Sequence, residues 1–238
     1  MINSKKILVV VPARSGSKGI PGKNKKTING IPLLAYPIIA ANKSKYVDKI
    51  IFSSDSREMC DIANKYGAET PFLRPKELAS DESVRSDMIL HALSYVKENF
   101  RENFDILVFL EPTSPLTNEN DIDTALDFFF KHNCESLVSV MESPTHHPEY
   151  AVELDSSTNI IKPFLRNSFN ELPMNRQSLK PLYFFDGSLY ISKIDKFIEK
   201  KEFYHEFTKG IVLDGNKSLE IDEPIDFLIA KEILKEYE

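Results

Sequence analysis

Short apolar runs alternate with longer stretches of helical character along the first part of the chain. The apolar runs are rich in β-branched residues and lie at residues 7–12, 49–53, 105–110 and 136–141. The helical stretches lie at residues 32–44, 56–67, 83–99 and 120–132. This alternation is typical of βαβ units, which build a parallel sheet covered by helices on both faces. We therefore predict an α/β fold with a mainly parallel sheet.

Residues 142–181 interrupt this alternation. They contain five prolines, at positions 144, 148, 163, 173 and 181. We expect an irregular excursion from the sheet, with a hairpin near residues 155–158. Strand-like composition returns at residues 183–192, and further helices are expected at 195–201 and 224–237. The predicted organisation is a core of residues 1–141 and 182–238 with an insertion at residues 142–181.

Charge and hydropathy exclude several classes of protein. The net charge of −6 and the pI near 5.5 argue against a nucleic-acid partner, which needs a basic footprint. No apolar run approaches the ~20 residues that cross a bilayer, so neither a membrane segment nor a signal peptide is expected. Cys60 and Cys134 are far apart and match no metal-ligand spacing. We expect buried thiols and a cytoplasmic protein.

A basic, glycine-rich segment follows the first predicted strand. Residues 13–24 hold three glycines, two serines and three basic residues. Consecutive backbone amides of such a loop can cradle an anion, and Arg14, Lys18 and Lys23 would add charge against a triphosphate. The segment fits neither a Walker A motif nor Gly-x-Gly-x-x-Gly. The alternative is a solvated surface loop.

Polar segments follow three of the predicted strands directly. They begin at Ala13, at Ser54-Asp55 and at Glu111. Open α/β sheets bind ligands beyond the carboxyl ends of their strands. The three segments therefore predict one site at that edge.

Six segments resemble, in order, the CMP-sialic acid synthetases, or acylneuraminate cytidylyltransferases. They are Arg14-x-Gly-Ser-Lys-Gly-x-Pro-x-Lys-Asn24, Leu73-Arg-Pro-x-Glu-Leu-Ala-Ser-Asp81, Leu110-Glu-Pro-Thr-Ser-Pro-Leu116, Arg176-Gln177, Asp186-Gly-Ser-Leu-Tyr190 and Glu220-Ile-Asp222. The resemblance implies a Rossmann-like nucleotidyltransferase fold with a small inserted dimerisation segment, and a homodimer. It also implies attack by the anomeric hydroxyl of a nine-carbon 2-keto-3-deoxy sugar acid on the α-phosphate of CTP, which releases pyrophosphate.

The resemblance also implies residue roles. The catalytic residues would be Lys23, Arg14 and Asp222. The nucleotide would contact Ala13, Arg14, Ser17, Lys18, Asn24, Arg74 and Ser83. The sugar would contact Glu111, Arg176, Gln177, Asp186, Tyr190, Phe203 and Tyr204. Asp222 and Glu220 would bind Mg²⁺, with Mn²⁺ as a possible substitute; the alternative is that Glu220, Asp222 and Glu223 merely cap the helix beginning at Pro224.

The sugar half departs from the family pattern. Glu111 stands where the sialic-acid enzymes commonly carry Gln, and Asp186 stands where they carry Asn. Glu220 replaces a usual Asp, while Phe184 and Tyr150 occupy places where basic residues occur. The substrate is therefore expected to be a bacterial nonulosonic acid: N-acetylneuraminate, legionaminate or pseudaminate. The alternatives are a 3-deoxy-manno-octulosonate or 8-amino-octulosonate cytidylyltransferase, and a non-catalytic nucleotide-binding protein of the same fold.

Overall fold

A six-stranded sheet forms the centre of the protein. The computed structural model describes residues 2, 4–16, 19–143, 146–213 and 217–236. Across the sheet the strand order is β10, β6, β9, β5, β1, β4. The strands span Ile7–Pro12 (β1), Lys49–Ser53 (β4), Ile106–Leu110 (β5), Ser136–Glu142 (β6), Tyr183–Lys193 (β9) and Thr208–Val212 (β10). β9 is antiparallel to both its neighbours, and the other pairs are parallel, so the expected mainly parallel sheet is confirmed.

Helices occupy the segments where the sequence predicts them. They span Tyr36–Lys43 (α1), Arg57–Lys65 (α2), Arg85–Asn99 (α3), Glu119–Lys131 (α4), Ile194–Lys200 (α5) and Pro224–Lys235 (α6). Ser56 caps α2 as its position suggests, because its hydroxyl accepts the Met59 N–H at 3.4 Å. The helix expected from residue 32 starts later, since Leu33–Ala35 form a 3-10 turn before α1.

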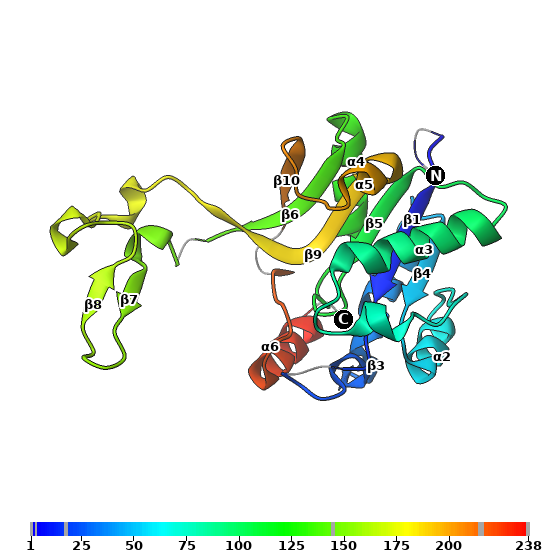
Figure 1. Cartoon of the computed structure of the whole chain (residues 1–238), viewed down its shortest axis with the longest axis horizontal. Coiled ribbons are helices and arrows are strands. Elements are labelled where there is room, and N and C mark those ends of the chain that lie inside the picture. The colour runs from blue at the N-terminus through cyan, green and yellow to red at the C-terminus, as the bar shows by residue number, and fades with distance from the viewer. Residues whose placement is uncertain (1, 3, 17–18, 144–145, 214–216, 237–238) are drawn as a thin grey trace.

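The two faces of the sheet carry separate hydrophobic cores. Ile7, Val9 and Val11 of β1 pack in the core shared with α1, α2 and α4. Leu8 and Val10 point the other way, into the core shared with α3 and α5. This follows from the alternation of side chains along a strand, which in a doubly covered sheet buries both sets. α3 crosses in front of the strands in Figure 1.

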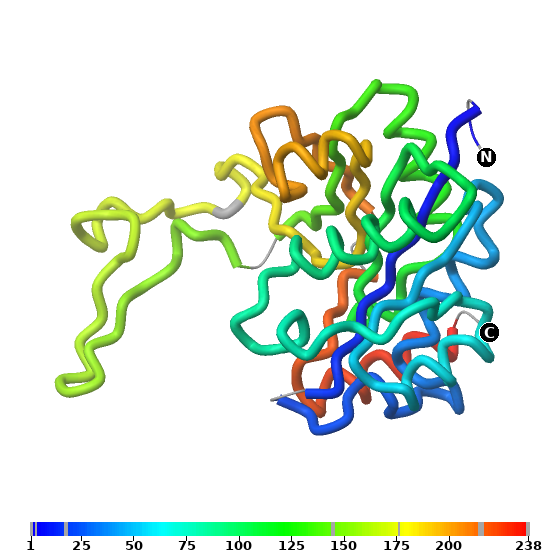
Figure 2. The backbone as a smooth tube through the Cα atoms, turned by 45° about the vertical axis from the view of Figure 1, so that its right-hand side comes forward, coloured from blue at the N-terminus to red at the C-terminus, as the bar shows by residue number. Residues whose placement is uncertain are grey.

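The segment between β6 and β9 stands away from the sheet. It contains a short hairpin of β7 (Val152–Leu154) and β8 (Ile161–Pro163). The expected turn lies between them, where the Asp155 carboxylate accepts the backbone N–H groups of Ser157 and Thr158. Both views show this projecting arm, residues 146–182, separate from the core (Figures 1 and 2).

A third, smaller hydrophobic cluster joins the two ends of the chain. Ile20, Ile28 and Leu33 from the N-terminal part pack with Ile221 and with Ala230 of α6. The short antiparallel pair β2 (Thr27–Ile28) and β3 (Ile31–Pro32) lies in this region. The cluster therefore places the C-terminal acidic motif beside the glycine-rich loop.

Two expectations from composition can be compared with the structure. Cys60 and Cys134 are both buried and free. Within the described ranges, no helix is both long and apolar enough to cross a membrane.

Candidate active site

A cleft of about 510 Å³ opens at the carboxyl ends of β1 and β5. It brings together segments of the glycine-rich loop, the second and third motifs and the acidic motif. The lining includes these residues with a role implied by the sequence: Ala13, Arg14, Lys23, Asn24, Arg74, Ser83, Glu111 and Asp222. The cleft lies where a parallel sheet is expected to bind its ligand.

Lys23 connects the glycine-rich loop to the acidic motif. Its Nζ donates to the Ile221 carbonyl at 2.5 Å and to Asp222 Oδ1 at 3.1 Å. Gly19 lies beside the same residue, because a Cβ at this position would stand 3.0 Å from the Asp222 carbonyl oxygen. A basic side chain and a carboxylate are thus held in contact at one end of the cleft.

The acidic motif presents two carboxylates on one side of the chain. Ile221 is fully buried and donates its N–H to the Thr113 carbonyl, while Glu220 and Asp222 on either side are exposed. The pKa of Glu220 is raised by partial burial and by the negative charge of Asp222. Glu223 caps α6 through a reciprocal pair of hydrogen bonds with Asp226, so the helix-cap interpretation is confirmed for Glu223.

Arg14 and Ser15 tie the start of the loop to neighbouring segments. Arg14 forms an ion pair with Asp81 of the second motif, with a 2.8 Å contact. The backbone N–H and hydroxyl of Ser15 both donate to Asp55, which follows β4, at 2.8 and 2.5 Å. Ser83 is half-buried, and its hydroxyl donates to the Ser80 carbonyl at 2.8 Å. Ser17 and Lys18 lie outside the described residues.

Arg74 is a buried residue of the cleft lining and connects the ends of two strands. Its guanidinium donates to the carbonyl oxygens of Ala13 and Ser53, at the ends of β1 and β4, and to the Ser53 hydroxyl. Burial lowers the pKa of Arg74 to about 10. Much of its hydrogen-bonding capacity is therefore used within the protein, and the implied contact with the nucleotide stays a prediction.

Glu111 begins the third motif and is paired with Arg85. The Glu111 side chain is only 19% exposed, and Arg85 Nη2 lies 3.3 Å from its Oε1. Burial raises the pKa of Glu111 to about 7, against the opposing effect of the Arg85 charge. Sequence reasoning identified Glu111 but missed Arg85, which belongs to none of the six segments.

Asp186 faces the interior between β6 and β9. Its carboxylate accepts the hydroxyls of Ser139 and Ser188, and the Ser188 N–H at 3.0 Å. The register of β9 against β6 shifts here, and Gly187 supplies the left-handed φ of 73° that the irregularity requires. Asp186 therefore shapes the strand beside Glu111, and a contact with the sugar stays a prediction.

An aromatic cluster forms the wall beside Glu111 and Arg85. Tyr190 and Phe203 are buried, with ring centroids 5.2 Å apart. Tyr204 is partly exposed and packs on Phe185 at 4.5 Å. Of the three aromatic residues with an implied sugar contact, Tyr190 and Phe203 are thus buried and Tyr204 is accessible.

Arg176 and Gln177 belong to a short 3-10 turn within the projecting arm. Gln177 is not among the described residues that line the cleft, and the side chain of Arg176 lies outside the described part of the chain. Their implied contact with the sugar stays a prediction.

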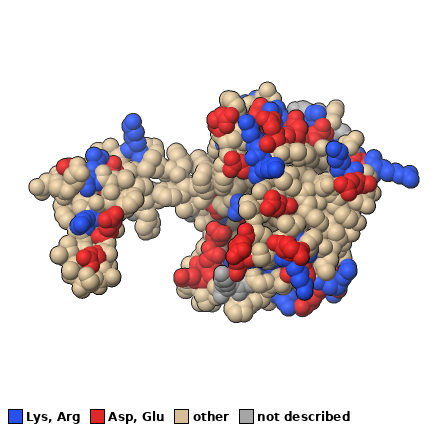
Figure 3. All heavy atoms as spheres, viewed as in Figure 1, with Lys and Arg blue, Asp and Glu red and all other residues tan. Residues whose placement is uncertain are grey.

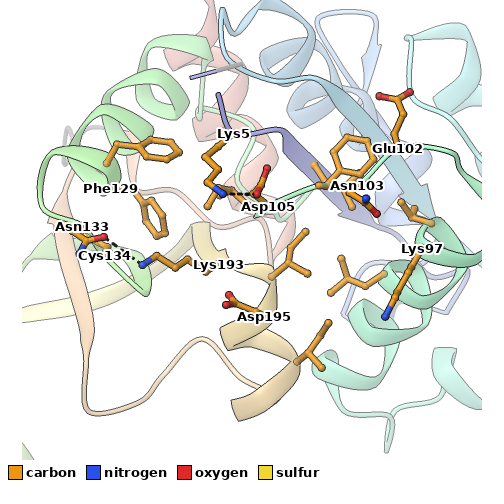
Figure 4. A pocket seen from close by; sticks show the side chains of 18 residues that line it. Lys5, Lys97, Glu102, Asn103, Asp105, Phe129, Asn133, Cys134, Lys193 and Asp195 are labelled. Carbon is orange, nitrogen blue, oxygen red and sulfur yellow. Dashed lines mark hydrogen bonds and ion pairs between the residues drawn. The ribbon is translucent and has the colours of Figure 1, made fainter. Parts of the chain in front are cut away.

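A second cavity, of about 720 Å³, lies at the amino ends of β1 and β5, opposite the end of the sheet where the first cleft opens (Figure 4). Lys5 and Asp105 form an ion pair in it at 2.7 Å, and Lys193 bonds to Asn133. None of the residues given a role above lines this cavity.

Comparison with known proteins adds independent information. A family model described as Cytidylyltransferase matches residues 8–234. The chain is 36% identical over 235 residues to a CMP-N,N'-diacetyllegionaminic acid synthase of Legionella pneumophila, covering 97% of each. It is 32% identical to an N-acylneuraminate cytidylyltransferase of Escherichia coli, covering 94% of this chain and 51% of that one. The structure of CMP:2-keto-3-deoxy-manno-octonic acid synthetase complexed with CTP matches with a TM-score of 0.69 at 15% identity, covering 98% of this chain and 100% of that one.

Proposed function

We propose that this chain, which belongs to the cytidylyltransferase family, transfers CMP from CTP to a nonulosonic acid. The observation that carries this proposal is the convergence of the loop cations, Glu111 and the acidic motif on one cleft. The relatives named for legionaminic and N-acylneuraminic acids support a nine-carbon acceptor. In the reaction, the anomeric oxygen forms a bond to the α-phosphorus of CTP, and the bond to the pyrophosphate oxygen breaks.

Phosphoryl-type transfer needs positioning and neutralisation of charge more than covalent chemistry. Arg14 and Lys23 line the cleft and can approach the triphosphate from the glycine-rich loop. Lys23 would stabilise the negative charge of the departing pyrophosphate as a compact point charge. Both cations are paired with carboxylates in this structure, so we expect the triphosphate to compete for them.

The acidic motif also fits Mg²⁺. Mg²⁺ is commonly bound through one or two carboxylates together with substrate phosphates. Asp222 and Glu220 supply such a pair. Burial and then the charge of Asp222 raise the pKa of Glu220, and a bound cation would relieve the repulsion between the two carboxylates. Within the described residues, no group of three or more His, Cys, Asp or Glu side chains could form a complete protein cage. When bound, Mg²⁺ would neutralise charge on the triphosphate.

The projecting arm supports a homodimer. Phe164 is 61% exposed and Met174 101% exposed, and Tyr183, Phe184 and Phe185 are exposed where β9 leaves the arm. Figure 3 shows no charged groups on the visible face of the narrow connection between the projecting arm and the core. Apolar surface of this extent is characteristic of a protein–protein interface. A second copy would cover it, and the partner could then bring its arm toward the cleft.

The test is pyrophosphate release from CTP and Mg²⁺ with N-acetylneuraminate, N,N'-diacetyllegionaminate, pseudaminate and 3-deoxy-manno-octulosonate. We expect release with a nine-carbon acid, none after removal of metal by EDTA, and recovery on adding Mg²⁺. Release with only the eight-carbon acid would contradict the acceptor class. No release with any acid, although CTP binds, would contradict transfer to these acids, and sedimentation as a fully active monomer would refute the dimer.

A further inference from the structure

Arg85 is the first residue of α3 and lines the cleft close to the third motif. Its guanidinium carbon lies 5.0 Å from the centre of the Tyr190 ring and 5.6 Å from that of Phe109. These are distances at which a cation is attracted to an aromatic face. Together with the 3.3 Å contact to Glu111, they hold Arg85 against the aromatic wall.

The side chain nevertheless remains 44% exposed. A guanidinium carries five N–H donors; the contact with Glu111 uses one of its nitrogens, and a hydrogen bond to Tyr190 engages a further donor. Donors are therefore left for a ligand in the cleft. Glu111 has a second carboxylate oxygen, which can accept a hydrogen bond beside them.

The other basic side chains of the described cleft are held by carboxylates or by backbone carbonyl oxygens of the protein. Arg14 pairs with Asp81, Lys23 pairs with Asp222, and Arg74 is bonded to the ends of β1 and β4. Arg85 differs because its contacts are with Glu111 and with Tyr190. Tyr190 lies on β9 directly opposite Phe109 of β5 and belongs to the aromatic cluster described above. Among the basic residues that line the described cleft, Arg85 is thus the one in contact with Glu111 and Tyr190, two residues with an implied sugar contact.

We propose that Arg85 is a specificity-determining residue that recognises an acylamino group on the acceptor. Its N–H groups would donate to the acyl carbonyl oxygen, and the free oxygen of Glu111 would accept an N–H or O–H from a neighbouring substituent. The acyl methyl group would contact the accessible rings of Phe185 and Tyr204. This inference rests on the proposed function and adds the chemical class of acceptor to it.

The chemistry of the wall favours an acylamino group over a hydroxyl. A guanidinium only donates, and Glu111 in its ionised form only accepts, so the ion pair needs a fixed acceptor and a fixed donor side by side. An amide oxygen is a fixed acceptor, and its methyl group can cover apolar ring surface that a hydroxyl leaves in water. A hydroxyl at the same carbon supplies neither the fixed acceptor nor the apolar contact.

The experiment compares two acceptors in steady-state pyrophosphate release. One is N-acetylneuraminate or N,N'-diacetyllegionaminate, whichever the wild type uses faster, and the other is the same acid with hydroxyls in place of its acetamido groups. The wild type should prefer the acylamino acid. Arg85→Ala should lower kcat/KM for that acid by about 10- to 100-fold, as for loss of a charge-assisted hydrogen bond. For the hydroxyl analogue the change should be below about threefold, with KM for CTP unchanged.

Three further variants separate recognition from a structural role. Arg101→Ala, beyond the far end of α3 and exposed, is the matched control and should keep wild-type values. Arg85→Lys should regain only part of the preference, because an ammonium lacks the planar fork. In Arg85→Ala with Glu111→Gln no unpaired carboxylate remains, and the preference should still be lost.

Equal losses with both acceptors, or full recovery in the double variant, would overturn the inference and leave the proposed function standing. The same holds if the wild type uses the hydroxyl analogue as well as the acylamino acid. Absence of release with every acceptor would instead refute the proposed function, and this inference with it.

Discussion

Replacing Lys23 by Met should separate catalysis from stability. Lys23 is 14% exposed and makes two contacts, one with the Ile221 carbonyl and one with Asp222, whose side chain is 67% exposed. An ion pair whose carboxylate is exposed to solvent contributes about 0–1 kcal/mol, and one hydrogen bond contributes about 1 kcal/mol. We expect a loss of roughly 1–2 kcal/mol, since Met keeps most of the buried aliphatic stem. In a chain of this size that lowers Tm by a few degrees.

The effect on the reaction should be much larger. Removing one group that stabilises developing charge typically costs about 100- to 1,000-fold in kcat. Lys23→Met should therefore reduce kcat by two to three orders of magnitude, measured as pyrophosphate release at saturating CTP and acceptor. Thermal unfolding followed by circular dichroism measures the accompanying change in Tm.

Lys25→Met is the matched control. It lies in the same 3-10 turn but pairs with Glu58 on the surface, outside the lining of the cleft. It should keep wild-type kcat. A Lys23→Met protein with unchanged kcat, or one whose loss of activity is matched by global unfolding, would refute the reasoning.

Two other substitutions, at Glu111 and at Asp186, test how these buried carboxyl groups affect the stability of the protein. Because burial raises the folded-state pKa of Glu111 to about 7 from 4.5, its contribution to stability is present below pH 4.5 and is lost as pH rises toward 7. The free energy of unfolding of Glu111→Gln, measured with urea, should then rise relative to that of the wild type by up to roughly 3 kcal/mol between pH 5 and 8. If the two proteins give parallel curves of unfolding free energy against pH, the raised pKa of Glu111 is contradicted. Asp186→Ala should cost about 1–3 kcal/mol, because the buried Ser188 N–H and hydroxyl lose the carboxylate that accepts from them. Wild-type stability of that variant would show that Asp186 is not structural, whereas surface Asp195→Ala should change little.

Local patterns were sufficient to predict the regular part of the fold. The runs at β1, β4, β5 and β6 are apolar on both faces, so each could be recognised by itself. β10 was not predicted, because it contains Lys209 and Gly210 and is mostly exposed at the sheet edge. Its strand character depends on pairing with β6, which is distant in sequence.

In the candidate site, too, some residues could be recognised from local sequence, whereas their contacts depend on the fold. Lys23 and Asp222 were recognised from motifs, and their contact required the fold to join residues 199 positions apart. Arg85 carried no signal, because a single arginine at a helix start is ordinary until Glu111 and Tyr190 are seen beside it. Arg74 was recognised from its motif, but its bonds to strand ends depend on burial that no local pattern reveals.

The pairing of Glu142 with Tyr183 has a consequence for how this protein can be shortened. These residues are direct partners at the ends of β6 and β9, so the whole intervening segment occupies the position of a hairpin turn. Closing a hairpin through such a long connection costs more entropy than a two-residue turn, although the cost grows only slowly with length. A chain in which an Asn-Gly turn replaces residues 143–182 should keep the sheet register, and it offers a compact, single-lobed nucleotide-binding scaffold for engineering.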